Sequence, residues 1–184
     1  MRYIIGFLCC SMFSLSSFAA TQVTERKHNL GVVLGVGMAN TQDERESDDA
    51  VSHMGVYYEY KLDNRYSVHM TALDGASQCL ILCNDSDTYV NYTSYQLSLK
   101  AATHFSGRWN LFGRAGADFY RVEYRQGTYH WGDDPKTISG ADIALALGGQ
   151  FRTKNGFSLN IEYQYLPIKQ GDLRTASVSV GYAF

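Results

Sequence analysis

The final residues 177–184 read SVSVGYAF, an alternating stretch that ends on an aromatic side chain. One face of this segment carries Val178, Val180, Tyr182 and Phe184, and the other carries only serine, glycine and alanine. Chain ends that lie in solvent usually fray and have no reason to keep such a pattern. The alternation therefore predicts that the C-terminus is a strand paired with another strand of the fold.

The same alternation of apolar and polar residues recurs in seven earlier segments. These segments are residues 30–38, 54–61, 66–72, 95–105, 109–119, 141–151 and 157–165. In residues 109–119, Phe112 fits the pattern poorly because it falls on the polar face. Several segments approach the roughly nine to eleven residues that a tilted membrane strand needs, and none is apolar for long enough to span a bilayer as a helix.

The connections between the eight segments alternate between long and short. Short turns are expected at 62–65 (LDNR), 106–108 (SGR) and 154–156 (KNG). The other four connections, which alternate with these turns along the chain, are longer. The chain has 14 Tyr and 17 Gly but only 2 Pro, a composition typical of strands rather than helices. Together these features predict an all-β, up-and-down antiparallel meander with its long loops gathered at one end.

Aromatic residues decide between a barrel in lipid and a barrel in water. The apolar face carries aromatic side chains beside every short turn and at the C-terminus: Tyr60, Tyr66, Phe105, Trp109, Phe151, Phe157 and Phe184. This arrangement predicts a girdle at one membrane interface. The charged residues share a face with glycine, alanine and serine, as expected inside a narrow barrel. We therefore expect an eight-stranded transmembrane β-barrel in which the last strand pairs with the first, since an open edge in lipid is costly.

The segments GRAGADFYR (113–121), IALALGGQFR (143–152) and VSVGYAF (178–184) resemble strands of the OmpA-like and OmpX-like family of small outer-membrane β-barrels. The resemblance implies a Gram-negative outer membrane, with insertion by the barrel-assembly machinery through the C-terminal strand. It also implies contact with outer-membrane lipid and lipopolysaccharide. We expect a monomer that consists of the transmembrane barrel alone.

Residues 1–20 read MRYIIGFLCCSMFSLSSFAA, with an early Arg2, an apolar run and small residues at the end. This layout predicts a signal peptide, cleaved after Ala19 or Ala20, which leaves residues 21–184 as the barrel domain. A retained membrane helix would need a longer apolar run without the interrupting cysteines and serines. In an oxidising exported compartment, we expect Cys79 and Cys83 to form a structural disulfide.

The overall charge and the loop sequences exclude several classes of ligand. The chain carries 18 acidic residues against 16 Lys and Arg, so it offers no large basic field for nucleic acid. The acidic segment 43–49 lacks the spacing of a calcium loop. We predict no metal site and no cofactor.

The inward face should hold a network of opposite charges. Its predicted members are Glu59, Lys100, Arg114, Glu162 and Asp118, with Asp142 and Arg152 as possible extensions. An unpaired charge in the lumen would be strongly disfavoured, so we expect these groups to pair. The resemblance points the same way, since OmpA-like barrels carry an interior cluster of similar composition. Such a network either plugs the lumen or gates a narrow polar path.

Three functions remain open from the sequence. We favour a structural or adhesin-like surface role, in which Tyr129 and Trp131 of the loop TYHWGDDP contact a host or surface ligand. The first alternative is a narrow channel for small solutes. The second is a lipid A-modifying enzyme, but the His-x-Ser pattern of such barrels and the Gly-x-Ser-x-Gly elbow are both absent, so we expect no enzymatic activity.

Overall fold

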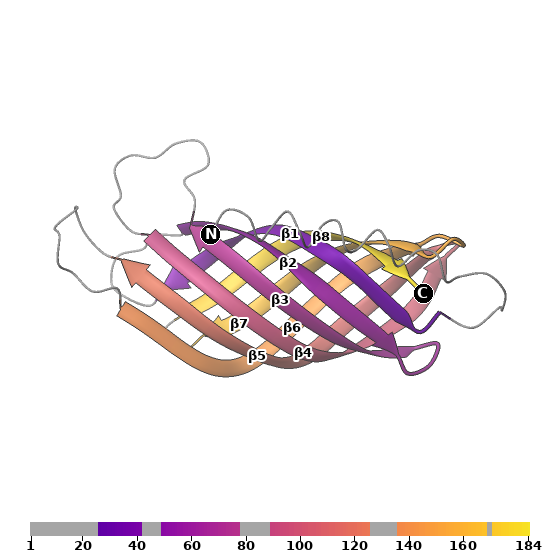
Figure 1. Ribbon diagram of the computed structural model, residues 1–184, viewed down its shortest axis with the longest axis horizontal. Coiled ribbons are helices and arrows are strands. Elements are labelled where there is room, and N and C mark those ends of the chain that lie inside the picture. Colours follow the sequence, from indigo (N-terminus) through magenta and orange to yellow (C-terminus); the bar gives the residue numbers. More distant parts are fainter. Residues whose placement is uncertain (1–25, 42–48, 78–88, 126–135, 169–170) are drawn as a thin grey trace, which may run out of the picture.

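A computed structural model describes residues 26–41, 49–77, 89–125, 136–168 and 171–184, which form one closed barrel of tilted strands (Figure 1). The eight strands are β1 (His28–Thr41), β2 (Asp49–Lys61), β3 (Tyr66–Ser77), β4 (Tyr89–Ser106), β5 (Trp109–Arg125), β6 (Lys136–Arg152), β7 (Phe157–Ile168) and β8 (Gly171–Ala183). Each strand pairs antiparallel with the next along the chain. The predicted fold class is confirmed. Among the described residues there is no helix of a length and hydropathy that would cross a bilayer.

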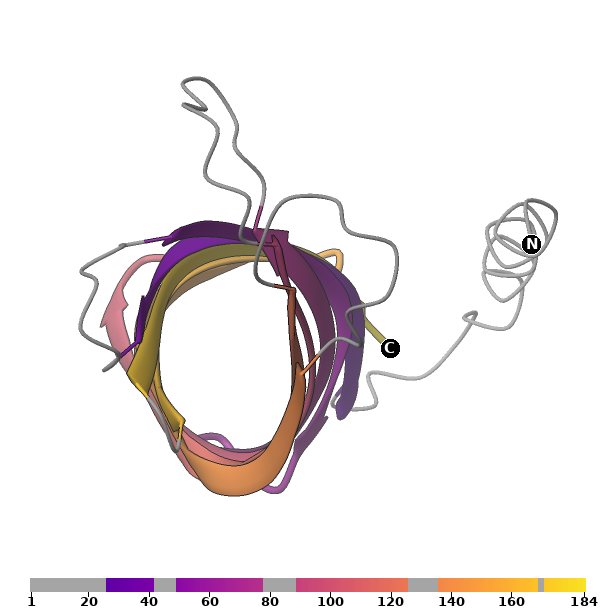
Figure 2. The same ribbon diagram turned by 90° about the vertical axis from the view of Figure 1, so that its left-hand side faces the viewer.

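The barrel is closed by pairing between β1 and β8. The register runs from Asn29 opposite Ala183 to Thr41 opposite Gly171. Beyond it, the N–H of His28 donates to the carbonyl of Phe184 at 3.1 Å, and the N–H of Phe184 donates back to His28 at 2.8 Å. The view along the barrel shows the resulting unbroken ring of strands (Figure 2). The C-terminus is thus held at the seam, as the alternation in 177–184 predicts.

The short turns lie together at one end of the barrel, at the predicted positions. In the β2–β3 turn, the Asp63 carboxylate accepts hydrogen bonds from the N–H groups of Arg65 and Tyr66, both at 2.7 Å. These hydrogen bonds hold the pKa of Asp63 below its usual range. In the β4–β5 turn, Gly107 has a φ of 59°, a left-handed conformation that glycine adopts without steric cost.

The strands extend further toward the long-loop end than the sequence predicts. Four strands include residues that the sequence predicts as connections, namely 49–53 in β2, 73–77 in β3, 89–94 in β4 and 136–139 in β6. β5 also continues to Arg125, past the predicted segment 109–119. In these extensions the pattern of polarity reverses. Asp74, Arg121 and Glu123 point outward, while Tyr92 and Val122 are buried inside. The reversal indicates that these strand extensions lie beyond the lipid, where the outer wall meets water.

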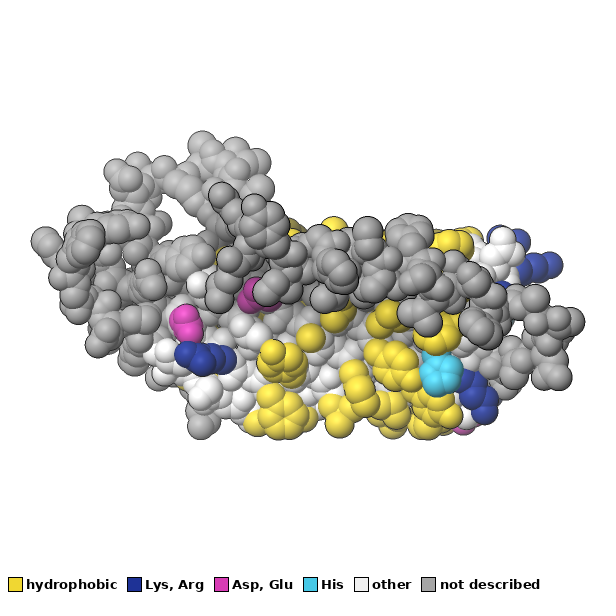
Figure 3. Space-filling view, in the orientation of Figure 1, with side chains coloured by type: hydrophobic (Ala, Val, Ile, Leu, Met, Phe, Trp, Pro, Cys, Tyr) yellow, Lys and Arg dark blue, Asp and Glu magenta, His cyan; other side chains and the backbone are white. Residues whose placement is uncertain are grey.

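The outer wall carries a wide belt of exposed apolar side chains (Figure 3). On β5 the belt runs from Trp109 to Phe119 and stops at Arg121. Ten steps of about 3.3 Å along a strand tilted by about 40° give a height of about 25 Å, which is the height of the apolar band of outer-membrane barrels. The belt therefore matches the hydrocarbon core of an outer membrane.

Inside the barrel, aromatic rings lie flat over glycines of the neighbouring strand. A Cβ at Gly31 would overlap the ring of Tyr57, and a Cβ at Gly75 would overlap the ring of Tyr92. The same relation holds between Gly148 and Phe112 and between Gly140 and Tyr120. Glycine on one strand thus provides the space that each large inward side chain needs in this narrow lumen.

Candidate functional site in the barrel lumen

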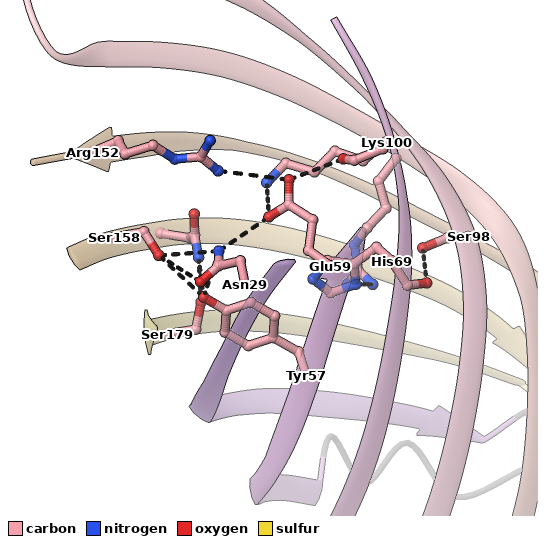
Figure 4. A network of polar contacts seen from close by, with 12 residues as sticks. Asn29, Tyr57, Glu59, His69, Ser98, Lys100, Arg152, Ser158 and Ser179 are labelled. Carbon is pink, nitrogen blue, oxygen red and sulfur yellow. Dashed lines mark hydrogen bonds and ion pairs between the residues drawn. The ribbon is translucent and has the colours of Figure 1, made fainter. Parts of the chain in front are cut away.

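Glu59 on β2 is the centre of a buried polar cluster near the short-turn end (Figure 4). Lys100 Nζ lies 3.3 Å from one carboxylate oxygen, and Asn29 Nδ2 donates to the same oxygen at 3.3 Å. The other oxygen accepts a hydrogen bond from Ser67 Oγ at 2.9 Å and lies 3.8 Å from Arg152 Nη2. Glu59 is therefore fully partnered despite an exposure of only 3%.

Arg114 on β5 forms the second ion pair of the lumen. Its Nη2 lies 2.7 Å from Glu162 Oε1, and its Nη1 contacts His69 Nδ1 at 3.2 Å and Gln96 Oε1 at 3.3 Å. A guanidinium only donates hydrogen bonds, so His69 Nδ1 accepts this one. The ring of His69 stacks on Tyr57 with their centroids 5.2 Å apart, which connects the two ion pairs through packed side chains.

Lys100 and Arg114 lie directly opposite each other in the β4–β5 register. Two like charges in this position repel each other, and a nearby anion beside each of them offsets the repulsion. Here Glu59 and Glu162 provide one carboxylate to each cation from the strands across the lumen. Phe112, which fits the sequence pattern poorly, points inward, and Lys100 Nζ lies 4.3 Å from the centre of its ring. This cation–π contact explains an aromatic residue on the polar face.

Asp118 joins the network through hydrogen bonds and not through an ion pair. Ser94 Oγ donates to its carboxylate at 2.5 Å, and Gln96 Nε2 donates to Ser94 at 3.2 Å. Gln164 Nε2 donates to Gln96 Oε1 at 2.7 Å, so the chain of contacts reaches across the lumen. Asp142 accepts a hydrogen bond from Tyr120 at 2.7 Å.

The half of the lumen nearer the long loops is mostly apolar. A cluster of buried side chains lies there: Val51, Tyr92, Tyr120, Val122, Ala144, Leu166 and Leu173. The interior therefore changes along the barrel axis, from paired charges near the short turns to apolar packing near the long loops. Both groups of side chains belong to the inner face of the ring of strands in Figure 2.

Comparison with known proteins identifies the family. A model described as "Outer membrane protein beta-barrel domain" matches residues 5–184. The chain belongs to this family. It is therefore an outer-membrane β-barrel protein, and its short turns are assigned to the periplasmic side and its long loops to the exterior. A search of curated proteins finds no match for the sequence.

Solved structures of other proteins share the fold. The chain is similar to Ail, the attachment invasion locus protein of Yersinia pestis, with a TM-score of 0.60 and 16% identity over 86% of this chain and 99% of that one. It is similar to Neisserial surface protein A, with a TM-score of 0.64 and 10% identity over 85% and 97%. It is also similar to AlkL, an outer membrane protein, with a TM-score of 0.54 and 14% identity over 92% and 96%.

The structure places all five predicted charged residues of the lumen on the inward face of the barrel. It brings together Glu59 with Lys100 and Arg114 with Glu162. All seven predicted girdle aromatics lie on the outer wall beside the periplasmic turns or at the seam, and Trp109 packs against Phe151 with ring centroids 5.3 Å apart.

Several predicted features lie outside the described residues. These are the signal peptide 1–20, the cysteines Cys79 and Cys83, and the loop residues Tyr129 and Trp131. Within the described ranges, no group of histidine, cysteine, aspartate or glutamate side chains could hold a metal ion.

Sequence reasoning missed several neutral members of the network. Asn29, His69 and Gln96 contact charged residues, and Tyr57 contacts Asn29 and His69. Each occupies an inward position of its strand. Alternation alone marks such residues as inward, but it does not show which of them meet across the lumen.

Proposed function

We propose that this protein is an occluded outer-membrane barrel that acts through its external loops in a surface interaction. The observation that supports the proposal is the set of buried side chains that project into the lumen, paired charges in the periplasmic half and an apolar cluster in the external half. A solute would have to separate buried ion pairs whose removal from water is compensated only while they stay together. An occluded barrel leaves the loops as the part able to bind ligands.

The proposed ligand site includes Tyr129 and Trp131, since aromatic side chains on loops dominate interface energetics. A structure of Ail has been determined in complex with the heparin analogue sucrose octasulfate, so a barrel of this fold can bind a ligand. In this chain the external segment 42–49 holds five acidic residues and one arginine. Its charge would repel a polyanion, and we therefore propose a neutral or cationic partner.

Occlusion is tested by conductance in planar lipid bilayers. We expect the purified mature barrel to give no stable conductance steps in 1 M KCl, whereas a general porin reconstituted in parallel does give them. A barrel that is heat-modifiable on gels, and so is folded, but conducts in regular steps would contradict the proposed occlusion.

The surface role is tested by adhesion of bacteria that display the protein. We expect cells with the wild-type barrel to bind host epithelial cells or their matrix, and cells with Y129A/W131A to lose most of this binding. The matched control is R121Q/R174Q, which changes exposed residues of the strands and leaves the aromatic loop intact. Equal binding by all three strains and by cells without the protein would refute the adhesin-like role.

A narrow solute path remains the second candidate because some buried polar atoms of the lumen have no protein partner. They include both ring nitrogens of His53, Nε of Arg114 and Nε of Arg152. Buried polar groups of this kind are usually satisfied by water, and a chain of waters favours a path for small solutes. If wild-type protein conducts and E59Q changes the size or the ion preference of the conductance, the channel is the better description.

We infer that the barrel performs no lipid A chemistry. In the part of the chain that the structure describes, no serine hydroxyl contacts a histidine ring nitrogen: Ser98 donates to the backbone carbonyl of His69, and Ser94 donates to Asp118. Lipid A from cells with and without the protein should therefore give identical mass spectra. A mass shift that depends on the protein would overturn this inference.

A further inference from the structure

The periplasmic end of the barrel carries a ring of exposed cations. Its members are Arg26, Lys27, Arg65, Arg108 and Lys154. Figure 3 shows Lys and Arg side chains at this end of the apolar belt, where the short turns lie. We propose that this periplasmic ring binds the phosphate headgroups of anionic phospholipids in the periplasmic leaflet of the outer membrane. This inference does not depend on the external ligand proposed above.

The cations are distributed around the whole circumference. Arg65 belongs to the β2–β3 turn, Arg108 to the β4–β5 turn and Lys154 to the β6–β7 turn. Arg26 and Lys27 precede β1 at the seam. Every hairpin on this side, and the seam as well, therefore contributes positive charge, so the ring faces the surrounding leaflet in all directions.

The backbone of the ring is held in place by the neighbouring strands. The carbonyl of Arg65 accepts a hydrogen bond from Ala102 at 2.7 Å. The carbonyl of Arg108 accepts one from Arg152 at 3.0 Å, and that of Lys27 accepts one from Lys61 at 2.8 Å. Each of these cations thus continues the sheet by one further pairing. The backbone at Lys27, Arg65 and Arg108 is therefore held at the end of the sheet, which fixes the points from which these side chains extend.

Few carboxylates neutralise the ring. Within the described residues, none of its five cations forms an ion pair. The exposed carboxylates of this end are Asp63, which accepts backbone N–H groups of its own turn, and the C-terminus at Phe184. Arg152 is also at this end, but it points inward to Glu59. The ring therefore has a clear excess of positive charge that an anion could balance.

The height of the ring matches the level of lipid headgroups. Arg65 precedes Tyr66 and Arg108 precedes Trp109, two aromatics of the girdle that marks the membrane interface. Arg26 lies 5.9 Å from the centre of the Tyr182 ring, again beside the interface. Cations just beyond such a girdle reach the phosphate level, where anionic lipids attract them.

The distribution of charge along the barrel axis favours binding of anionic phospholipid at the periplasmic end and not at the external end. The external segment 42–49 is acidic, and the outward-facing Arg121 and Arg174 are each paired with a carboxylate, Glu123 and Asp172 respectively. A cell-wall polymer also carries carboxylates, but it lies beyond the membrane surface and would not need cations at girdle height. The phosphate of a phospholipid is the anion that lies at the level of the ring.

Trp109 provides a probe at the ring itself. It lies next to Arg108 and is 42% exposed on the outer wall, and the variant W131F removes the other tryptophan of the chain. The refolded barrel is placed in phosphatidylcholine vesicles that contain either brominated phosphatidylglycerol or brominated phosphatidylcholine at equal mole fraction. The ratio of Trp109 quenching by the two lipids gives the relative association constant of the anionic lipid.

In 20 mM NaCl we expect a relative association constant of about 3 for phosphatidylglycerol, and a value of about 1 after R65Q/R108Q/K154Q or in 0.5 M NaCl, because salt screens exposed charges. The control R121Q/R174Q removes two external cations and should leave the ratio near that of the parent. Heat-modifiability on gels verifies that each variant is folded.

Two results would overturn the proposal. One is a ratio of 1 in the parent protein, and the other is a preference that survives the triple substitution. Sedimentation with purified peptidoglycan sacculi tests the competing ligand. If the parent protein shows no lipid preference but binds sacculi, and the triple variant does not, the ring serves the cell wall and the lipid proposal is wrong.

Discussion

The contact between Gly75 and Tyr92 leads to the most quantitative prediction. Gly75 on β3 lies opposite Tyr92 on β4, and the Tyr92 ring lies flat over it. A Cβ at Gly75 would be 2.6 Å from Cζ and 2.8 Å from Cδ1 of that ring. Because all the crowded atoms belong to one ring, the variant G75A would displace Tyr92 from the apolar cluster of the external lumen.

The expected cost follows from two opposing terms. Overpacking of this kind costs about 1 to 3 kcal/mol, whereas replacing a strand glycine by alanine gains about 0.5 to 1 kcal/mol. We expect a net loss of about 1 kcal/mol, and at most about 2.5 kcal/mol, in the free energy of unfolding. At Gly113 on the lipid-facing wall, the nearest atom to an added Cβ is Leu147 Cδ2 at 3.3 Å, so G113A should be neutral or stabilising.

The assay is equilibrium unfolding in urea of barrels refolded in lipid vesicles, followed by tryptophan fluorescence. Y92A alone should cost about 3 to 5 kcal/mol, the usual range for a buried aromatic. In G75A/Y92A the alanine Cβ enters space that the ring has left, so the double variant should lose at least about 1 kcal/mol less than the sum of the singles. Additive costs, or equal stabilities of G75A and G113A, would refute the reasoning.

Three further predictions concern the lumen, a turn and the seam. K100M removes the cation nearer to the buried Glu59 carboxylate and leaves Arg152, 3.8 Å away, as its cationic partner. Urea titration should therefore show a loss of about 3 to 5 kcal/mol, and E59Q/K100M should recover much of it. The hydrogen bonds of the β2–β3 turn lower the pKa of the Asp63 carboxyl in the folded barrel. The stability that these hydrogen bonds contribute is therefore fully present above the pKa of the unfolded carboxyl and is lost as the pH falls through the folded pKa. An NMR titration in which the Asp63 carboxyl follows that of an unstructured reference peptide would contradict this prediction. F184A removes the stack on His28, with ring centroids 5.6 Å apart, but keeps the backbone pairing, so the mature variant should refold to a heat-modifiable barrel with a loss of about 1 kcal/mol.

The sequence predicts the lipid-facing part of the strands well but not their external ends. Residues 109–119 keep one polarity pattern because the lipid contacts one face throughout. From Arg121 onward the outer face meets water and the inner face packs around Tyr120 and Val122, so the same strand reverses its pattern. Alternation of one polarity ends at Phe119, so it does not predict that the strand continues to Arg125.

The sequence by itself determined the number of strands, their order, the face that meets lipid and the pairing of the chain end. These properties follow from local alternation and turn chemistry, since the direction of each side chain in a strand depends only on its position in the pleat. Only the tertiary structure decided which inward groups meet. Glu59 pairs with Lys100, 41 residues away, and Asn29 contacts Ser158, 129 residues away. These contacts depend on the tilt and relative register of the strands around the closed barrel, because tilt and register set the height of every side chain in the lumen.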